Sequence, residues 1–316
     1  MARIARSGLI VLAALVAAGA QAAEPPTAAP LLPKDAAVKP ARPRRLLIFN
    51  LCTGFRHGVI PFAARTVEQV GRETGAFESV STEDIALFEP ERLKDFDAVF
   101  LNNTCGELFL PKDLAKLPAE AQGAARARDA RLRQGLADFV KGGKGLAGNH
   151  AAAAAFYRWP EFGEMLGAYF QSHGWGAFDA PIKVDDPKSP LTAMFDPAGF
   201  QIKEEIYLFA DKASKGPYYF ERQPYSRQNL HVLLSINTSK MDAAKAAKGG
   251  RADGDYGISW VRRWGRGRIF YTAFGHSEAI FRNERVLRHI LAGLQFVLGD
   301  LEADAAPSAA AGKEGV

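Results

Sequence analysis

The chain contains 316 residues, of which 47% are hydrophobic and 24% charged, and its formal net charge is +5. This charge comes from residues 1–45, which contain seven Lys or Arg and two acids, whereas the rest contains 33 residues of each sign. Because the main part of the chain has no overall basic field, we do not expect it to bind nucleic acid.

Residues 1–23 have the pattern of a secretory signal peptide. Arg3 and Arg6 precede an apolar run over 8–20, and the small residues at 20–23 suit cleavage. The run is too short to span a bilayer, although an uncleaved membrane anchor is the alternative interpretation. We therefore expect a periplasmic or secreted protein that has no membrane span after signal cleavage.

The composition also predicts the domain boundaries. Residues 24–44 are rich in Pro and Ala, which is typical of a linker, and residues 303–316 have the small residues of a disordered tail. The remaining residues, 45–302, are enough for one large domain with a substantial core.

Strands and helices alternate in the first half of this domain. Apolar runs predict strands at 46–49, 77–81, 97–102 and 145–148, and helical spacing predicts helices at 61–74, 125–141 and after 150. Apolar strands that lack polar alternation are typical of a doubly wound, mostly parallel sheet. Ligands of such sheets bind beyond the carboxyl ends of the strands.

The second half is richer in strands. After a helix at 161–170, strands are predicted at 182–184, 201–208, 230–236, 257–262 and 268–274, with a hairpin turn at 265–267. A helix at 284–298 follows, and the polar stretch at 240–255 is expected to be a mobile loop. We predict a single α/β domain with a β-rich C-terminal half.

Two cysteines follow predicted strands. Cys52 comes after the strand at 46–49, and Cys105 comes after the strand at 97–102. If the two strands are neighbours, both thiols lie at the carboxyl edge of the sheet, where an oxidising compartment permits a disulfide. A Cys52–Cys105 disulfide and two free buried thiols both remain open, since sequence does not give the Cα separation.

His150 occupies a strand–turn–helix position. The segment Gly148-Asn149-His150-Ala151 follows a short apolar strand, which is the setting in which a nucleophile elbow presents Ser or Cys. An imidazole at this position can bind a metal or move a proton, but it does not readily form an acyl-enzyme.

Several segments resemble those of ThuA-like (trehalose utilisation) proteins in the class I glutamine amidotransferase-like superfamily. They are Arg56-His57-Gly58, the run 143–150 that ends in Asn149-His150, 170–174 with His173, 204–207 with Glu204-Glu205 and Tyr207, Gly257-Ile258-Ser259-Trp260, and 267–276 ending in His276. The resemblance implies a flavodoxin-like doubly wound sheet and a role in the catabolism of sugars, including oxidised (keto) sugars. Because amidotransferases carry Cys where this chain has His150, no glutaminase activity is expected.

Histidines cluster in glycine-containing turns of the predicted fold. His57, His150 and His276 each follow a predicted strand, and His173 lies in another such turn. Three imidazoles and a water make an open catalytic zinc site, so these four histidines are the candidate ligands of a divalent metal, with zinc favoured. No nucleotide cofactor is expected.

The candidate catalytic residues are His150, Glu107 and Glu205. A carboxylate must serve such a site as ligand or as acid and base, and Glu107 follows the third strand of the pattern. The resemblance leaves open whether Glu204 or Glu205 points into the site.

Planar polar groups and aromatic rings are typical of sugar sites. Arg56, Asn149, Trp175 and Tyr207 are the candidate substrate-binding residues, and the glycines that flank Trp175 predict that its ring is exposed.

Together these features favour an exported carbohydrate-active enzyme that hydrolyses or eliminates at a keto sugar or glycoside with the help of a metal. The alternative is a non-catalytic protein that binds a sugar or a partner on the same fold.

Overall fold

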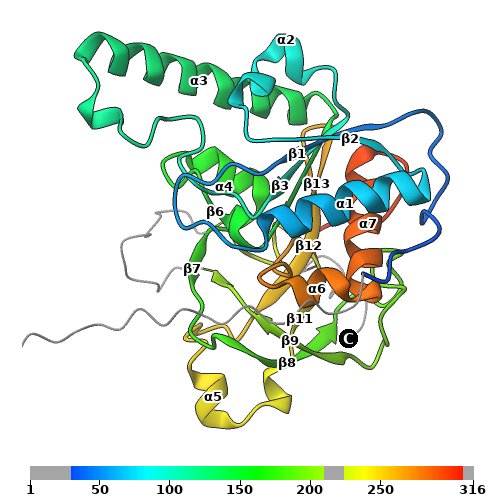
Figure 1. The fold of residues 1–316 in the computed structure, drawn as a ribbon. Coiled ribbons are helices and arrows are strands. Elements are labelled where there is room, and N and C mark those ends of the chain that lie inside the picture. The colour runs from blue at the N-terminus through cyan, green and yellow to red at the C-terminus, as the bar shows by residue number, and fades with distance from the viewer. Residues whose placement is uncertain (1–29, 210–223, 309–316) are drawn as a thin grey trace, which may run out of the picture.

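The computed structural model describes residues 30–209 and 224–308, and its centre is a nine-stranded sheet. The strand order is β2-β1-β3-β5-β13-β12-β11-β8-β9, and helices cover both faces (Figure 1). The predicted signal peptide at 1–23 lies outside the described residues.

The first half of the sheet is parallel. Its strands are β2 (Glu78–Thr82), β1 (Arg45–Phe49), β3 (Ala98–Asn102), β5 (Gly145–Asn149) and β13 (Gly267–Thr272). The three inner strands β1, β3 and β5 are almost wholly buried, which explains their apolar sequences. All five carboxyl ends lie at one edge, as the alternating pattern predicts.

The second half of the sheet, in the C-terminal part that the sequence predicts to be β-rich, is antiparallel. Its strands are β12 (Gly257–Trp264), β11 (His231–Ile236), β8 (Ala177–Val184) and β9 (Phe200–Glu205). The predicted hairpin at 265–267 joins β12 to β13, and Gly265 has φ of +59°. The edge strand of this half is β9, and Glu205 is its last residue.

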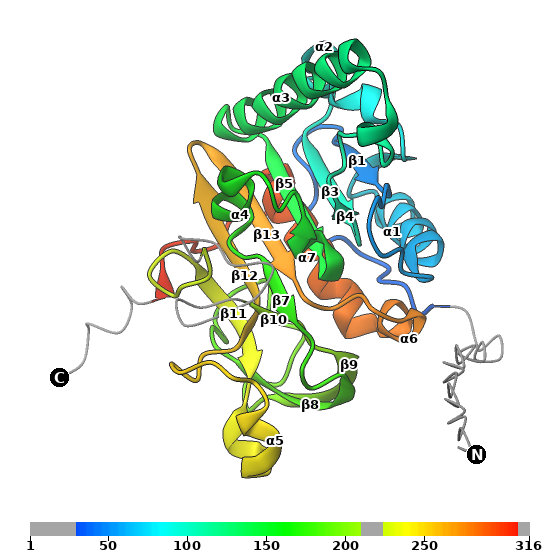
Figure 2. The same cartoon turned by 90° about the vertical axis from the view of Figure 1, so that its left-hand side faces the viewer.

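Helices pack on the two faces of the sheet. On one face lie α1 (Ile60–Thr74), α6 (Glu278–Arg282) and α7 (Glu284–Leu298), which contact one another. On the other lie α4 (Pro160–Leu166) and the long α3 (Ala119–Lys141), which packs on the short α2 (Pro90–Leu93) (Figures 1 and 2). This arrangement confirms a mixed α/β fold.

Short elements replace some predicted ones. The helix expected after His150 is a single 3-10 turn, His150–Ala153, which runs into β6 (Ala154–Ala155) paired with β4 (Cys105–Gly106). The expected helix at 161–170 ends at Leu166, and β7 (Phe170–Ser172) pairs with β10 (Leu208–Phe209). Further 3-10 turns are Ile85–Phe88, Leu114–Lys116 and Thr238–Lys240.

The segments that flank the domain are bound to it where the structure describes them. The side chain of Gln295 accepts hydrogen bonds from the backbone of Ala37 and Val38, and Arg44 pairs with buried Asp300 at 2.6 Å. At the other end, Ser308 N donates to Leu230 O at 3.0 Å. The described parts of the predicted linker and tail, 30–44 and 303–308, therefore make hydrogen bonds to the domain.

The polar stretch 240–255 is also more ordered than expected. It contains α5 (Ala243–Ala247), whose first turn is capped by the Asp242 carboxylate.

None of the described helices has both the length and the apolarity that crossing a bilayer requires.

Candidate metal centre

Three histidines and one glutamate meet at the carboxyl edge of the parallel strands. His57 lies between β1 and α1, His150 follows β5, His276 follows β13, and Glu205 ends β9. One ligand atom from each of these four residues lies within 4.8 Å of the others. The ring centroids of the three imidazoles are 5.0 to 5.6 Å apart.

His150 is held in a strained turn with one ring nitrogen left free. Its φ of +40° lies in the left-handed region, as expected for a sharp elbow between a strand and a helical turn. Its Nδ1 lies 3.0 Å from Ala273 O, which makes Nδ1 the protonated nitrogen, since the carbonyl only accepts. The lone pair of Nε2 is therefore available to a metal or a proton.

Tyr207 and Glu205 border the ring of His150. The Tyr207 ring covers its face, with 3.9 Å between centroids. Glu205 Oε2 lies 3.4 Å from His150 Nε2 and 3.8 Å from His276 Nε2.

The neighbouring Glu204 points away from the imidazoles. Its Oε1 accepts the backbone N–H of His276 at 2.7 Å, so it positions the turn that carries this histidine. Glu205 is consequently the acid of the Glu204–Glu205 pair that enters the site. Burial raises the pKa of Glu204 to about 8.

The environment favours the neutral forms of His57 and His150 and the ionised form of Glu205. Burial lowers the pKa of His57 to about 3, and it also lowers the pKa of His150. Burial alone would raise the pKa of Glu205, but the imidazoles of His150 and His276 lower it below its usual value. Neutral nitrogen ligands beside a carboxylate are what a divalent metal such as zinc requires.

Unpartnered buried nitrogens support the fit of a metal. His57 Nδ1 and His150 Nε2 are buried, and neither has a hydrogen-bond partner within the described ranges. Ligands about 2.0–2.1 Å from a tetrahedral zinc lie roughly 3.3 Å apart, and the ligand atoms of the three histidines lie within 4.8 Å of one another. His276 and Glu205 remain partly exposed, so the group opens to solvent on their side.

Comparison with known proteins identifies the family. The sequence profile of ThuA, described as trehalose utilisation, matches residues 45–297. The chain belongs to the ThuA family.

Solved ThuA-like structures have the same fold at low sequence identity. One from Bacteroides uniformis is 20% identical with a TM-score of 0.56, and the match covers 87% of this chain and 95% of that chain. One from Parabacteroides merdae is 16% identical with a TM-score of 0.55, with coverage of 82% and 91%. No curated protein matches this chain.

A buried amide network supports the site of this ThuA-family chain. Asn149 Oδ1 accepts the backbone N–H of Asn103 at 2.9 Å, and Asn103 donates to Gly275 O at 3.1 Å. The Asn149 side chain is fully buried, so its surroundings favour a supporting role over the substrate contact expected from sequence. Asn103 and the carbonyl of Ala273 carried no sequence signal that pointed to the site.

Two candidate residues lie outside the four-residue group. His173 is exposed, although its ring lies 6.0 Å from that of Phe170, which packs on Tyr207. The Glu107 carboxylate pairs with Arg133 at 2.9 Å and accepts the backbone N–H of Arg158, so it is engaged in holding α3 rather than facing the imidazoles.

Two candidate sugar contacts are also engaged elsewhere. Trp175 is only 7% exposed and donates through Nε1 to Lys245 O in α5, so its expected exposure is wrong. Arg56 pairs with Glu83 at 2.6 Å on the surface. The exposed ring beside the site is Phe55, which is 72% exposed and lies 5.0 Å from the His57 ring.

Cys52 and Cys105 are neighbours with free thiols. They form an isolated parallel bridge next to the strands that precede them, which confirms their expected proximity, but no disulfide joins them.

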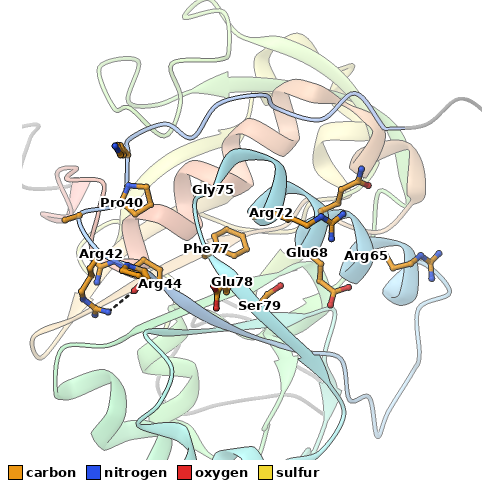
Figure 3. A pocket seen from close by; sticks show the side chains of 15 residues that line it. Pro40, Arg42, Arg44, Arg65, Glu68, Arg72, Gly75, Phe77, Glu78 and Ser79 are labelled. Atoms are coloured by element: carbon orange, nitrogen blue, oxygen red, sulfur yellow. Dashed lines mark hydrogen bonds between the residues drawn. The ribbon is translucent and has the colours of Figure 1, made fainter.

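A groove of about 1060 Å³ lies far from the imidazoles (Figure 3). It is lined by residues 39–44, α1 and the start of β2, at the amino ends of the strands. Two of its arginines are already paired, Arg42 with Asp97 and Arg44 with Asp300. The groove and the four-residue group therefore lie at opposite edges of the parallel strands.

Proposed function

We propose that this chain is a carbohydrate-active enzyme that hydrolyses or eliminates at a keto sugar or glycoside with the help of a divalent metal, zinc in the first instance. The observation that supports the proposal is the convergence of His57, His150, His276 and Glu205 within 4.8 Å. Membership of a family described as trehalose utilisation supports a carbohydrate substrate.

The four residues divide into ligands and a proton acceptor. His57, His150 and His276 would hold the metal, and burial favours the neutral, ligating form of His57 and His150. Glu205 is the proton acceptor, since its Oε2 lies 3.4 Å from His150 Nε2 and the neighbouring imidazoles favour its ionised form. Glu107 is not assigned this role because Arg133 neutralises it.

The chemistry follows from the acidity of a carbon next to a ketone. When bound, the metal supplies a Lewis acid that polarises the carbonyl oxygen of a 3-keto sugar. Glu205 Oε2 removes the proton from C2, the C1–oxygen bond then breaks, and the departing oxygen takes this proton from Glu205. The products are an unsaturated keto sugar and a free alcohol, and addition of water to the former completes hydrolysis.

Aromatic rings beside the site suit a pyranose. Phe55 is one of two large hydrophobic side chains that are exposed in the described part of the chain, and it lies next to His57. The apolar C–H face of a sugar ring packs on such a ring, which makes Phe55 the proposed platform for the substrate. Tyr207 instead lies under His150 and supports the ligand.

The test is turnover of 4-nitrophenyl 3-keto-β-D-glucopyranoside, read as release of nitrophenol, together with zinc analysis of the same samples. We expect His150→Ala to lose zinc and turnover, and Glu205→Gln to keep zinc but lose turnover. His173→Ala is the matched control and should keep both. Loss of zinc in Glu205→Gln would contradict the division of roles.

Sugar binding without product in the zinc-loaded protein, unchanged by Glu205→Gln, would instead support a non-catalytic binding protein. The unoxidised 4-nitrophenyl glucoside provides the substrate control, because it lacks the ketone that acidifies C2.

We also propose that the protein is exported. The support is the sequence pattern over residues 1–23. Cell fractionation with amino-terminal analysis of the mature protein tests this, and an intact Met1 on cytoplasmic protein would refute it.

A further inference from the structure

Cys52 and Cys105 lie close enough together for a disulfide to form between them. They face each other across a parallel bridge, and adjacent strands lie about 4.8 Å apart, within the roughly 4.4–6.8 Å Cα separation of disulfides. Cys105 is partly exposed while Cys52 is buried, so a soluble reagent reaches Cys105 first.

The Cys52 thiol holds the backbone of Phe55. Its Sγ donates a hydrogen bond to Phe55 O at 2.9 Å. The hydrogen bond from the Cys52 S–H therefore helps to fix the loop that contains Phe55.

That loop carries His57 to the metal centre. Thr53 N and Gly54 N donate to Cys105 O at 2.8 and 3.0 Å, and the Phe55 ring packs edge-on against His57. The space around Gly54 is tight, because a Cβ there would lie 2.8 Å from Cys105 Sγ. A change at the sulfurs is therefore transmitted over five residues to His57.

We propose that Cys52 and Cys105 are an oxidation site, at which disulfide formation alters the loop that presents Phe55 and His57. The oxidant is a low-molecular-weight disulfide. One of the two protein thiolates attacks a sulfur of this reagent and releases one small thiol. The other protein thiolate then attacks the resulting mixed disulfide and releases the second. Two protein S–H bonds are replaced by one S–S bond, and the reagent is reduced to two thiols.

Oxidation removes the donor that binds Phe55 O. The sulfurs must also approach to bonding distance, which draws the backbone at 52–55 toward β4. The disulfide itself does not depend on the proposed function, whereas its effect on metal affinity rests on it.

The first test uses the wild-type protein in oxidised and reduced glutathione. We expect intact mass to fall by two hydrogens and both cysteines to resist alkylation in the oxidised buffer, with reversal by reductant. The single variants Cys52→Ser and Cys105→Ser cannot form the disulfide, and the remaining cysteine should instead retain a glutathione adduct. Two cysteines that remain alkylatable in the folded protein under oxidising conditions would overturn the oxidation site.

The second test measures coupling to the loop. Amide hydrogen exchange of residues 53–57 should change on oxidation, and zinc affinity should fall about tenfold, as expected when the support of a ligand is lost. The double variant Cys52→Ser/Cys105→Ser is the control and should not respond to the redox buffer. Equal exchange and equal zinc affinity in both states would overturn the coupling. If zinc binds in neither state, the proposed function fails while the disulfide stands.

Discussion

The phenol ring of Tyr207 lies against the imidazole of His150, with 3.9 Å between centroids and 35° between planes. The ring of Phe170 also packs on this tyrosine, with 4.2 Å between centroids. The stack and the Ala273 carbonyl together determine the direction of His150 Nε2.

Removal of the Tyr207 ring should therefore weaken metal binding, although Tyr207 is not one of the four residues of the group. We expect Tyr207→Ala to lower zinc affinity about tenfold, in the range found for residues that orient a ligand. Tyr207→Phe keeps the stack and should change affinity by no more than about twofold. Competition with a zinc chelator measures both, and an equal loss in the two variants would show that the hydroxyl matters instead.

Gly275 is the backbone position on which His276 depends. Its φ is +145°, and a Cβ there would lie 2.2 Å from Asn149 Nδ2. Gly275→Ala should cost about 2–4 kcal/mol of unfolding free energy, from strain and from the clash, and should weaken zinc binding. Urea unfolding and zinc titration measure the two effects.

Gly123 in α3 offers the matched control. A Cβ at Gly123 would meet no atom within 4 Å in the described structure, and the residue is exposed on a helix. Gly123→Ala should stabilise the protein by about 0.5–1 kcal/mol. If both substitutions changed the free energy of unfolding in the same direction, the argument from the clash and the positive φ at Gly275 would be wrong.

Local patterns predict much of this fold because they record burial. The apolar runs of β1, β3 and β5 correspond to strands buried on both faces, and the helical spacing in α7 corresponds to a face packed on β13 and β5. Local patterns do not predict the order of the antiparallel strands, because this order depends on which strands pair after the chain has folded. The strands β8 and β9 were therefore predicted only in part.

The sequence predicts the part of the site that lies at the carboxyl ends of the parallel strands. His57, His150 and His276 follow parallel strands, and such ends gather at one edge. Glu107 also follows a strand, but its partner Arg133 comes from a helix 26 residues further on. The burial of Trp175 likewise depends on α5, which sequence indicated only as a polar loop. The surroundings of each of these two side chains are therefore determined by a partner distant in the sequence.

Phe55 should affect substrate binding more than the chemical step. Phe55→Ala removes the exposed ring beside His57 and should raise KM for the keto-glycoside about tenfold with little change in kcat. Phe55→Trp keeps a flat face and should retain most of the affinity. Leu31→Ala, at the other exposed large hydrophobic residue, should change neither constant. A fall in kcat alone would contradict a binding role.

His289 should make the fold sensitive to acid independently of the metal centre. The ring is fully buried in α7, with Nδ1 2.7 Å from Leu191 O and Nε2 2.9 Å from Ser259 Oγ. Burial lowers the pKa of His289 to about 4 from its usual value of 6.5. The unfolded chain therefore takes up a proton that the folded chain excludes as the pH falls from 6.5 to 4.

This difference in proton uptake should cost about 3 kcal/mol of stability across that pH window, while above pH 6.5 it costs nothing. His289→Gln is expected to be less stable at neutral pH, because it disturbs the buried packing, but to lose about 3 kcal/mol less on acidification. Urea unfolding of the metal-free protein at pH 7, 5.5 and 4 measures the difference. His173→Gln is the control and should follow the wild-type profile, because that histidine is exposed. Parallel profiles for His289→Gln and wild type would show that the buried imidazole does not govern acid stability.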